Sequence, residues 1–318
     1  MAKNPGKSQI DKAAETFMGL PAAELSSLGG ARGVILGVPG CTPYGSVGAY
    51  CADGPAVIRA ALTGHAASSG HVDFDASPPA IFNEPDIAAS IVDSGDLPFD
   101  TGNFVANRTR LRDAVTRILD EGAVPILLGG DDSIQTPFFE AHAGRGRFTI
   151  LQIDAHIDWR DEVQGERFGL SSGMRRASEM EHVERIIQVG QRSIGSARAA
   201  DLVDARQWGV ELIPARGVAQ AGITSAIESV PEGSDIIVAL DCDALDPSMM
   251  PAVMSRAPGG ISYWDVINLI EGASLRGNLA GFAITELMPD RDIDGMGAEV
   301  AARIVANVVR LVARSETC

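Results

Sequence analysis

The sequence predicts a single α/β domain of three layers, in which helices cover both faces of a mostly parallel central sheet. Short apolar runs alternate with amphipathic stretches along most of the 318 residues. The runs are apolar throughout and not only at every second position, which is typical of strands buried on both faces of a parallel sheet. The chain has no internal repeat and no low-complexity linker. We therefore expect residues 1–30 to form an N-terminal extension and residues 31–318 to form one domain.

The elements follow from these patterns in chain order. The extension has only a weak helical periodicity, around residues 11–20. Six apolar runs predict strands, at 33–38, 123–128, 148–153, 185–189, 235–240 and 279–284. Apolar residues at helical spacing predict helices at 103–120, 262–276 and 297–314, the last apolar nearly all round and therefore well buried. The segments 39–55 and 64–80 are rich in Gly, Ser and Pro, and we expect them to be long loops over the functional site.

Charge and cysteine usage exclude several classes of protein. The 26 basic and 42 acidic residues give a net charge of −16, which repels nucleic acids and anionic membrane surfaces. The same charge suits a cationic substrate or metal ions, and serves solubility equally well. No apolar stretch approaches the ~20 residues of a membrane helix, and the N-terminus does not resemble a secretory signal. Four cysteines without CxxC or zinc spacing indicate a reduced compartment, so we expect a cytoplasmic protein.

Acidic residues come directly after four of the predicted strands, which is where open α/β sheets bind ligands. The motifs are GGDDS at 129–133, DAHID at 154–158, DCDALDP at 241–247 and Glu286 in TELMP at 285–289. In extended backbone alternate residues share a face, so Asp154, His156 and Asp158 should lie together, as should Asp241 and Asp243.

Carboxylates at such density cannot all stay ionised without cations. Oxygen-rich ligation with one imidazole suits Mn²⁺, with Ni²⁺ or Co²⁺ as alternatives. A single DxD is more often a turn or a helix cap than a metal site. Two such motifs at strand ends, with further acids at a third and a fourth, favour a metal site.

Three earlier motifs complete the pattern: GVP at 37–39, DGPAVIR at 53–59 and DSGD at 93–96. With these, residues 33–314 resemble the ureohydrolase family, which includes arginases, agmatinases and other guanidino-acid hydrolases. Members bind two metal ions, usually manganese, and hydrolyse a guanidinium group to urea and an amine. The resemblance implies an arginase-like fold and an assembly of three or six copies.

The resemblance also assigns roles to residues. Asp154 and Asp241 would bridge the two ions, with Asp158 completing one ion and His156 and Asp243 the other. Glu286 would face the guanidinium and, with Asp158, belong to the catalytic set. Trp159 would either line the entrance for the substrate or pack the loop.

The sequence departs from the family pattern twice. The family has GGDHS where this chain has GGDDS, so Asp132 replaces a metal-binding histidine. Five carboxylates then carry −5 against +4 from two divalent ions, which makes bound water less acidic. Asp132 is either a ligand in a retuned site or a replacement that leaves one metal loosely held. At 171–174 the sequence SSGM places Ser172 where many members have a proton-shuttle histidine. The proton would then come through the metal-bound water and a carboxylate, or from His65, His71, His142 or His182, of which His142 and His182 are expected on helices.

The leading functional hypothesis is metal-dependent hydrolysis of a guanidino compound, agmatinase-like or acting on guanidine, an alkylguanidine or a biguanide. The substrate would be a small cation, bound by Glu286 with Ser172 and Trp159 nearby. The alternative is a non-catalytic or half-catalytic subunit, whose paralogous partner performs the chemistry. That alternative explains the two missing histidines, but it predicts drift at the other ligand positions as well.

Overall fold

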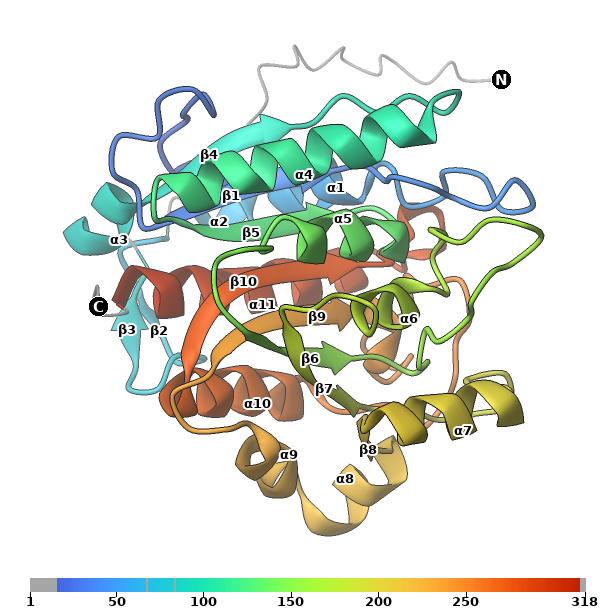
Figure 1. Cartoon of the computed structure of the whole chain (residues 1–318). Helices are drawn as coiled ribbons and strands as arrows, with labels where there is room; N and C mark the ends of the chain where they lie inside the picture. Colours follow the sequence, from blue (N-terminus) through green and yellow to red (C-terminus); the bar gives the residue numbers. More distant parts are fainter. Residues whose placement is uncertain (1–15, 67, 83, 315–318) are drawn as a thin grey trace, which may run out of the picture.

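The computed structural model describes residues 16–66, 68–82 and 84–314. Their centre is a sheet of eight strands in the order β4-β1-β5-β10-β9-β6-β7-β8, and every neighbouring pair in it is parallel (Figure 1). The strands are β1 (Gly33–Val38), β4 (Ile91–Asp96), β5 (Val124–Gly129), β6 (Phe148–Ile153), β7 (Val183–Val189), β8 (Glu211–Ile213), β9 (Asp235–Asp241) and β10 (Asn278–Thr285). The predicted three-layer α/β class with a parallel sheet is confirmed.

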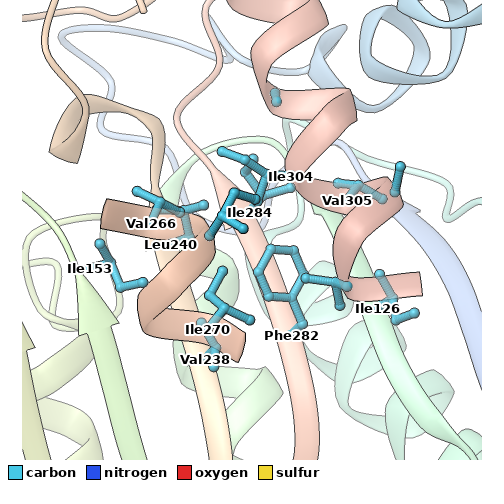
Figure 2. Close-up of a cluster of buried hydrophobic side chains, with 14 of the residues drawn as sticks. Ile126, Ile153, Val238, Leu240, Val266, Ile270, Phe282, Ile284, Ile304 and Val305 are labelled. Atoms are coloured by element: carbon cyan, nitrogen blue, oxygen red, sulfur yellow. The ribbon is translucent and has the colours of Figure 1, made fainter. Parts of the chain in front are cut away.

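Helices cover both faces of this sheet. Four of them, α4 (Phe104–Asp120), α5 (Gln135–Glu140), α6 (Gly173–Ala177) and α7 (Ala199–Trp208), contribute side chains to one buried layer. The opposite layer contains α1 (Gly54–Ala61), α3 (Pro85–Ser90), α8 (Ala215–Ala221), α9 (Thr224–Ser229), α10 (Tyr263–Arg276) and α11 (Met296–Arg314). In Figure 2, Phe282 and Ile284 of β10 lie between Val266 and Ile270 of α10 and Ile304 of α11. No helix in the described ranges is long and apolar enough to cross a membrane.

The six predicted strands and three predicted helices all form, with helix ends within one residue of the prediction. The apolar runs of the sequence do not predict β4 and β8, which are the two edge strands of the large sheet. β4 contains the polar run Asp93-Ser94-Gly95-Asp96, and β8 has only three half-buried residues. Neither has the continuous apolar run by which strands buried on both faces are found.

Residues 16–30 pack against the domain along the edge strand β4. Phe17 is fully buried, and its backbone N–H donates to Oδ2 of Asp93 at 2.8 Å. Ala22 forms a parallel bridge with Asp93. Within residues 16–20 of the predicted weak helix there is a single 3-10 turn, Phe17–Gly19, and residues 1–15 lie outside the described ranges.

Two of the sequence motifs meet in a buried ion pair beneath this edge. The guanidinium of Arg59 in α1 contacts the carboxylate of Asp93 through two hydrogen bonds, Nε to Oδ2 at 2.8 Å and Nη2 to Oδ1 at 2.9 Å. Arg59 also contacts Asp96. Two parallel bonds to one carboxylate fix the position of α1 on the sheet.

The two predicted loops lie at opposite ends of the sheet. Residues 39–53 cross its carboxyl end, where the backbone N–H groups of Cys41 and Thr42 donate to Oγ of Ser133 at 3.2 and 2.6 Å. Residues 64–80 contain parts of α2 (Thr63–Ala66) and of a small antiparallel pair, β2 (Val72–Asp73) and β3 (Ala80–Ile81). This pair lies near the amino ends of the strands (Figure 1), and Asp73 pairs there with Arg310 of α11. The prediction that residues 64–80 cover the site is therefore wrong, because composition identifies a loop without indicating its end of the sheet.

Candidate metal centre

Three central strands end in the same kind of turn. In each, an aspartate side chain accepts a hydrogen bond from the backbone N–H two residues later, as in an Asx turn. The pairs are Asp131 with Ser133 at 3.0 Å after β5, Asp154 with His156 at 2.6 Å after β6, and Asp241 with Asp243 at 2.6 Å after β9. The i, i+2 spacing thus arises from turns and not from the alternation of extended backbone, which corrects the reasoning from the sequence. Ala155, Ile157 and Cys242 are buried in packing, as expected.

These turns bring all six predicted ligands together. Two sets of side chains each have ligand atoms within 4.8 Å of one another. The sets are Asp154, His156, Asp241 and Asp243, and Asp132, Asp154 and Asp158. Asp154 belongs to both sets, as expected of a bridging ligand, whereas Asp241 belongs to the first alone. Six carboxylate or imidazole groups with one nitrogen donor among them suit Mn²⁺ or a similar ion.

The electrostatics of the cluster show a need for cations. Burial, and then the neighbouring carboxylates, raise the pKa of Asp158 and Asp241 well above the usual range. The same causes raise the pKa of Asp132 to about 8. Burial opposes the charge of His156, but hydrogen bonds to Asp154 and Asp243 outweigh it and raise the pKa of the imidazole to about 11. The carboxylates therefore resist ionisation, and the imidazole beside them retains its proton. Divalent ions bound among these groups would supply positive charge in place of the protons.

Asp132 faces this cluster and is held there by its neighbours. Its Oδ1 accepts hydrogen bonds from Nε2 of Gln135 at 2.6 Å and from the hydroxyl of Thr285. Its backbone N–H donates to Oε1 of Glu286 at 2.9 Å. Only 2% of Asp132 is exposed, on the wall of the cavity described next. Asp132 therefore lies beside the other predicted ligands.

A cavity of about 180 Å³ opens over the cluster. It is lined by Asp132, His156, Asp158 and Asp243, by Glu286 and Tyr50, and by residues including Trp159, Arg160, Leu170, Ser171, Asp201, Val253 and Met254. Both oxygens of Glu286 are held, since Oε1 accepts from the Asp132 backbone and Oε2 accepts from the Tyr50 hydroxyl at 2.5 Å. Burial, and then Asp132, raise the pKa of Glu286. The carboxylate is therefore fixed in direction at the cavity wall.

Glu286 and Asp158, the two residues predicted to be catalytic, share an uncommon backbone conformation. Their φ angles are 65° and 44°, in the left-handed region that few residues other than glycine adopt. Such strained positions cluster at functional sites, where the surrounding structure enforces them. The N–H of Glu286 donates to the carbonyl of Gly130 at 2.8 Å, which ties the end of β10 to the end of β5.

Tyr50 is the contact that the sequence analysis missed. It lies in the loop at 39–53, where no motif or periodicity distinguishes it from its neighbours. Burial, and then Glu286, raise the pKa of its hydroxyl far above the usual value, so Tyr50 stays protonated and donates to Glu286. Only the closure of this loop over the carboxyl end of the sheet brings Tyr50 to the site.

The other predicted substrate contacts are placed differently. Trp159 does both things that the sequence left open: it contributes to the cavity wall, and it packs inward with 2% exposure. Its indole N–H donates to Oδ2 of Asp204 in α7 at 2.7 Å. Ser172 is fully buried, its hydroxyl has no hydrogen-bond partner, and the adjacent wall is formed by Leu170 and Ser171. Ser172 thus lies behind the cavity wall and not on it.

The four remaining histidines do not line the cavity. His65 and His71 line a separate cavity beside α11. His142 and His182 pack against the ring of Phe148, in turns that follow α5 and precede β7. The expectation that these two lie on helices is wrong, and both are packing residues. His156 is thus the one imidazole at the cavity.

Comparison with known proteins agrees with the fold. Residues 31–310 match the sequence profile described as "Arginase family". The chain is 31% identical to "Arginase 1, mitochondrial" of Arabidopsis thaliana, over 70% of this chain and 67% of the relative. It is 28% identical to an agmatinase of Pyrococcus horikoshii, over 88% of this chain and 92% of the relative.

Among solved structures, a hypothetical agmatinase from Burkholderia thailandensis superposes with a TM-score of 0.79. The superposition covers 94% of this chain and 91% of the agmatinase chain, at 23% sequence identity, and establishes a common fold. The sequence match over most of the chain goes further, and the chain belongs to the arginase family.

Proposed function

We propose that this protein hydrolyses a C–N bond of a guanidino compound with two divalent metal ions, Mn²⁺ or alternatively Ni²⁺. The observation that carries the proposal is the pair of ligand sets that share Asp154 and open into the same cavity as Glu286. Relatives whose names are arginase and agmatinase support the reaction type.

The residues present fit such ions. Asp132, Asp154 and Asp158 would hold one ion, and Asp154, His156, Asp241 and Asp243 would hold the other. When bound, the ions supply Lewis acidity and lower the pKa of water. They also take the place of the protons on the carboxylates and on the imidazole of His156, which otherwise offset the negative charge of the cluster.

Glu286 binds the substrate cation. A carboxylate that faces a planar guanidinium forms strong charge-assisted hydrogen bonds. Because one oxygen is held by the backbone of Asp132 and the other by Tyr50, the carboxylate is already oriented before the substrate arrives. Preorganisation of this kind lowers the cost of holding the substrate next to the ligand cluster.

A proton must reach the departing amine. With Ser172 behind the wall and four histidines elsewhere, the candidates are Asp132, Asp158 and Asp243, the carboxyl groups that both line the cavity and belong to a ligand set. Of these three, Asp158 is the one predicted to be catalytic, and it shares its left-handed backbone conformation with Glu286. We assign it the transfer of a proton from the attacking water to the leaving nitrogen, in the role of general base and then general acid.

The cavity favours a small substrate. Its volume of about 180 Å³ is below the ~300–1,000 Å³ of pockets for drug-sized ligands. Leu170, Val253 and Met254 make part of the wall apolar, and the guanidinium of Arg160 lies in the wall 3.4 Å from Asp201. Guanidine, a short alkylguanidine or a biguanide suits this cavity better than a substrate with a long, second cationic end.

The test combines metal content with turnover. The purified chain, stripped with a chelator and reloaded with Mn²⁺ or Ni²⁺, should hold close to two ions per subunit and release urea or a urea derivative. The substrates compared are guanidine, methylguanidine, a biguanide, agmatine and arginine. Asp154→Asn should lose both ions, because Asp154 belongs to both ligand sets. Asp235→Asn, at the other end of β9 from Asp241, is the matched control and should keep both.

Two results would contradict the proposal. A saturated and desalted protein without bound ions excludes the metal-dependent reaction. Two tightly bound ions without turnover of any substrate, together with turnover on addition of a paralogous chain, would instead indicate the non-catalytic subunit.

A further inference from the structure

Two glutamines form a polar pair inside the sheet, directly below the ligand cluster. Gln152 on β6 and Gln188 on β7 are neighbours in the parallel register, and both are fully buried. Ile150 and Ile186, two residues earlier on each strand, lie in the hydrophobic layer on this face. A buried amide in such a layer is costly unless its hydrogen bonds are made.

The hydrogen bonds of this pair run toward the carboxylates. Nε2 of Gln152 donates to Oδ2 of Asp154 at 2.6 Å and to Oδ2 of Asp158 at 2.9 Å, which uses both of its hydrogens. Oε1 of Gln152 accepts from Nε2 of Gln188. The second hydrogen of Gln188 goes to the carbonyl oxygen of Ile157 at 2.8 Å.

This arrangement fixes which way each amide points. The carbonyl of Ile157 can only accept, so Gln188 must turn its NH₂ group toward it and present that same group to Gln152. Gln152 must then turn its oxygen toward Gln188 and its NH₂ group toward the carboxylates. The direction is retained although Oε1 of Gln188 has no hydrogen-bond partner, which is a cost for a buried atom. A reversed Gln152 would place its oxygen against two carboxylates.

We infer that Gln152 is a positioning residue for the metal ligands Asp154 and Asp158, and that Gln188 acts through Gln152 by fixing the direction of its amide. The inference rests on the proposed dinuclear function. Groups that hydrogen-bond to metal ligands orient them, and their loss typically reduces metal affinity about 10- to 100-fold.

The two ions should not be affected equally. Both carboxylates that Gln152 contacts belong to the set Asp132, Asp154 and Asp158, whereas only Asp154 belongs to the other set. The loss of Gln152 should therefore weaken the ion in the first set more than the ion held with His156. A general loosening of the fold would weaken both.

The experiment titrates the full-length chain, after removal of its metal with a chelator, with Mn²⁺. Binding is monitored by calorimetry and by electron paramagnetic resonance. Gln152→Leu preserves the apolar layer and removes the donor, and Gln152→Met serves if the leucine variant does not fold. Gln188→Leu tests the second amide. Thr149→Val, a buried change on the same strand with no contact to a ligand, is the control.

We expect the native chain and Thr149→Val to bind two ions and to give the signal of a coupled Mn²⁺ pair. Gln152→Leu should bind one ion near native affinity and the second about 10- to 100-fold more weakly, with an uncoupled Mn²⁺ signal at one equivalent. On this proposal Gln188 acts on the two carboxylates through Gln152, so the double variant should match Gln152→Leu, and Gln188→Leu alone should lie between it and the native chain.

Native affinities for both ions in Gln152→Leu would overturn the positioning role, as would an equal loss at both sites. An additive effect in the double variant would overturn the relay from Gln188. A native chain that takes up no ions would overturn the proposed function and this inference together, so the native titration distinguishes the two failures.

Discussion

Replacing Asp132 by asparagine should change the stability of the metal-free protein and its response to metal in opposite directions. The substitution keeps the shape of the side chain and removes its charge. An asparagine oxygen can still accept from Gln135 and Thr285, which hold Oδ1 of Asp132. Its NH₂ group would face the carboxylate of Asp158, to which Asp132 is hydrogen-bonded through a shared proton.

The magnitude follows from the raised pKa of Asp132, about 8 in place of 3.8. A folded-state pKa above the unfolded value means that the unfolded chain gives up this proton first as the pH rises. The stability that the proton confers is thus complete below pH ~4 and is lost progressively up to pH ~8. Between pH ~4 and pH 7 the free energy of unfolding falls by ~1.4 kcal/mol for each of about three pH units, so ~4 kcal/mol at most is lost at pH 7. Because Asp158 shares the proton, we expect the asparagine variant to gain ~1–4 kcal/mol at pH 7.

The assay is urea unfolding of chelator-treated protein at pH 4 and pH 7, with and without Mn²⁺. Without metal, Asp132→Asn should exceed the native chain in free energy of unfolding at pH 7 and match it at pH 4. With Mn²⁺, the gain in stability should be smaller for the variant, because one ligand set has lost a charged member. Asp132→His should keep the response to metal, since the resemblance of the sequence implies an imidazole ligand at this position.

Equal stability of Asp132→Asn and the native chain at pH 7 without metal would refute the electrostatic reasoning. An unchanged stabilisation by Mn²⁺ would show that Asp132 is not a working ligand. Loss of one ion from the native chain during desalting, with retention in Asp132→His, would show that the aspartate leaves that metal loosely held.

Three further predictions concern parts of the chain outside the ligand cluster. Burial lowers the pKa of His142 from 6.5 to about 4. As the pH falls from 7 to 4, the free energy of unfolding of the native chain, measured with urea, should therefore decrease by ~3 kcal/mol relative to that of His142→Phe. A difference that stays constant with pH would contradict a buried neutral imidazole. Arg59→Leu should lower the free energy of unfolding by ~3–5 kcal/mol, because it leaves the carboxylate of Asp93 buried and unpaired. Adding Asp93→Asn to the same chain should recover part of this loss, whereas additive losses would argue against the ion pair. The three described cysteines are free and buried. Thiol titration should therefore find four free thiols after denaturation, three of which do not react in the folded protein. A disulfide would contradict the predicted cytoplasmic location.

Some of the fold is encoded locally enough to be predicted from the sequence. A strand buried on both faces must be apolar at every position, so β1 and β6 were found with their observed ends and the central sheet could be assembled from such runs. Edge strands such as β4 and β8 escape this rule, because one side of each has no neighbouring strand to bury it. The position of residues 64–80 also escapes it, because loop composition is the same at either end of a sheet.

The meeting of the predicted ligands follows from the sequence for a similar reason. Parallel strands end at one edge of the sheet, so acids directly after β5, β6 and β9 must meet there, whichever way the backbone turns. The predicted alternation was the wrong local geometry, yet Asp132, Asp154 and Asp241 still converge, because the sheet and not the turn brings them together.

Only the tertiary structure decides what surrounds the ligands. Tyr50 reaches Glu286 through the closure of a loop, Ser172 is turned behind the wall, and Gln188 meets Gln152 because β6 and β7 pair in one register. Each of these contacts joins segments whose separation along the chain carries no periodic signal. The sequence by itself determines which groups meet at the predicted metal site, because strand ends coincide, and the packing of loops and neighbouring strands decides how those groups are oriented.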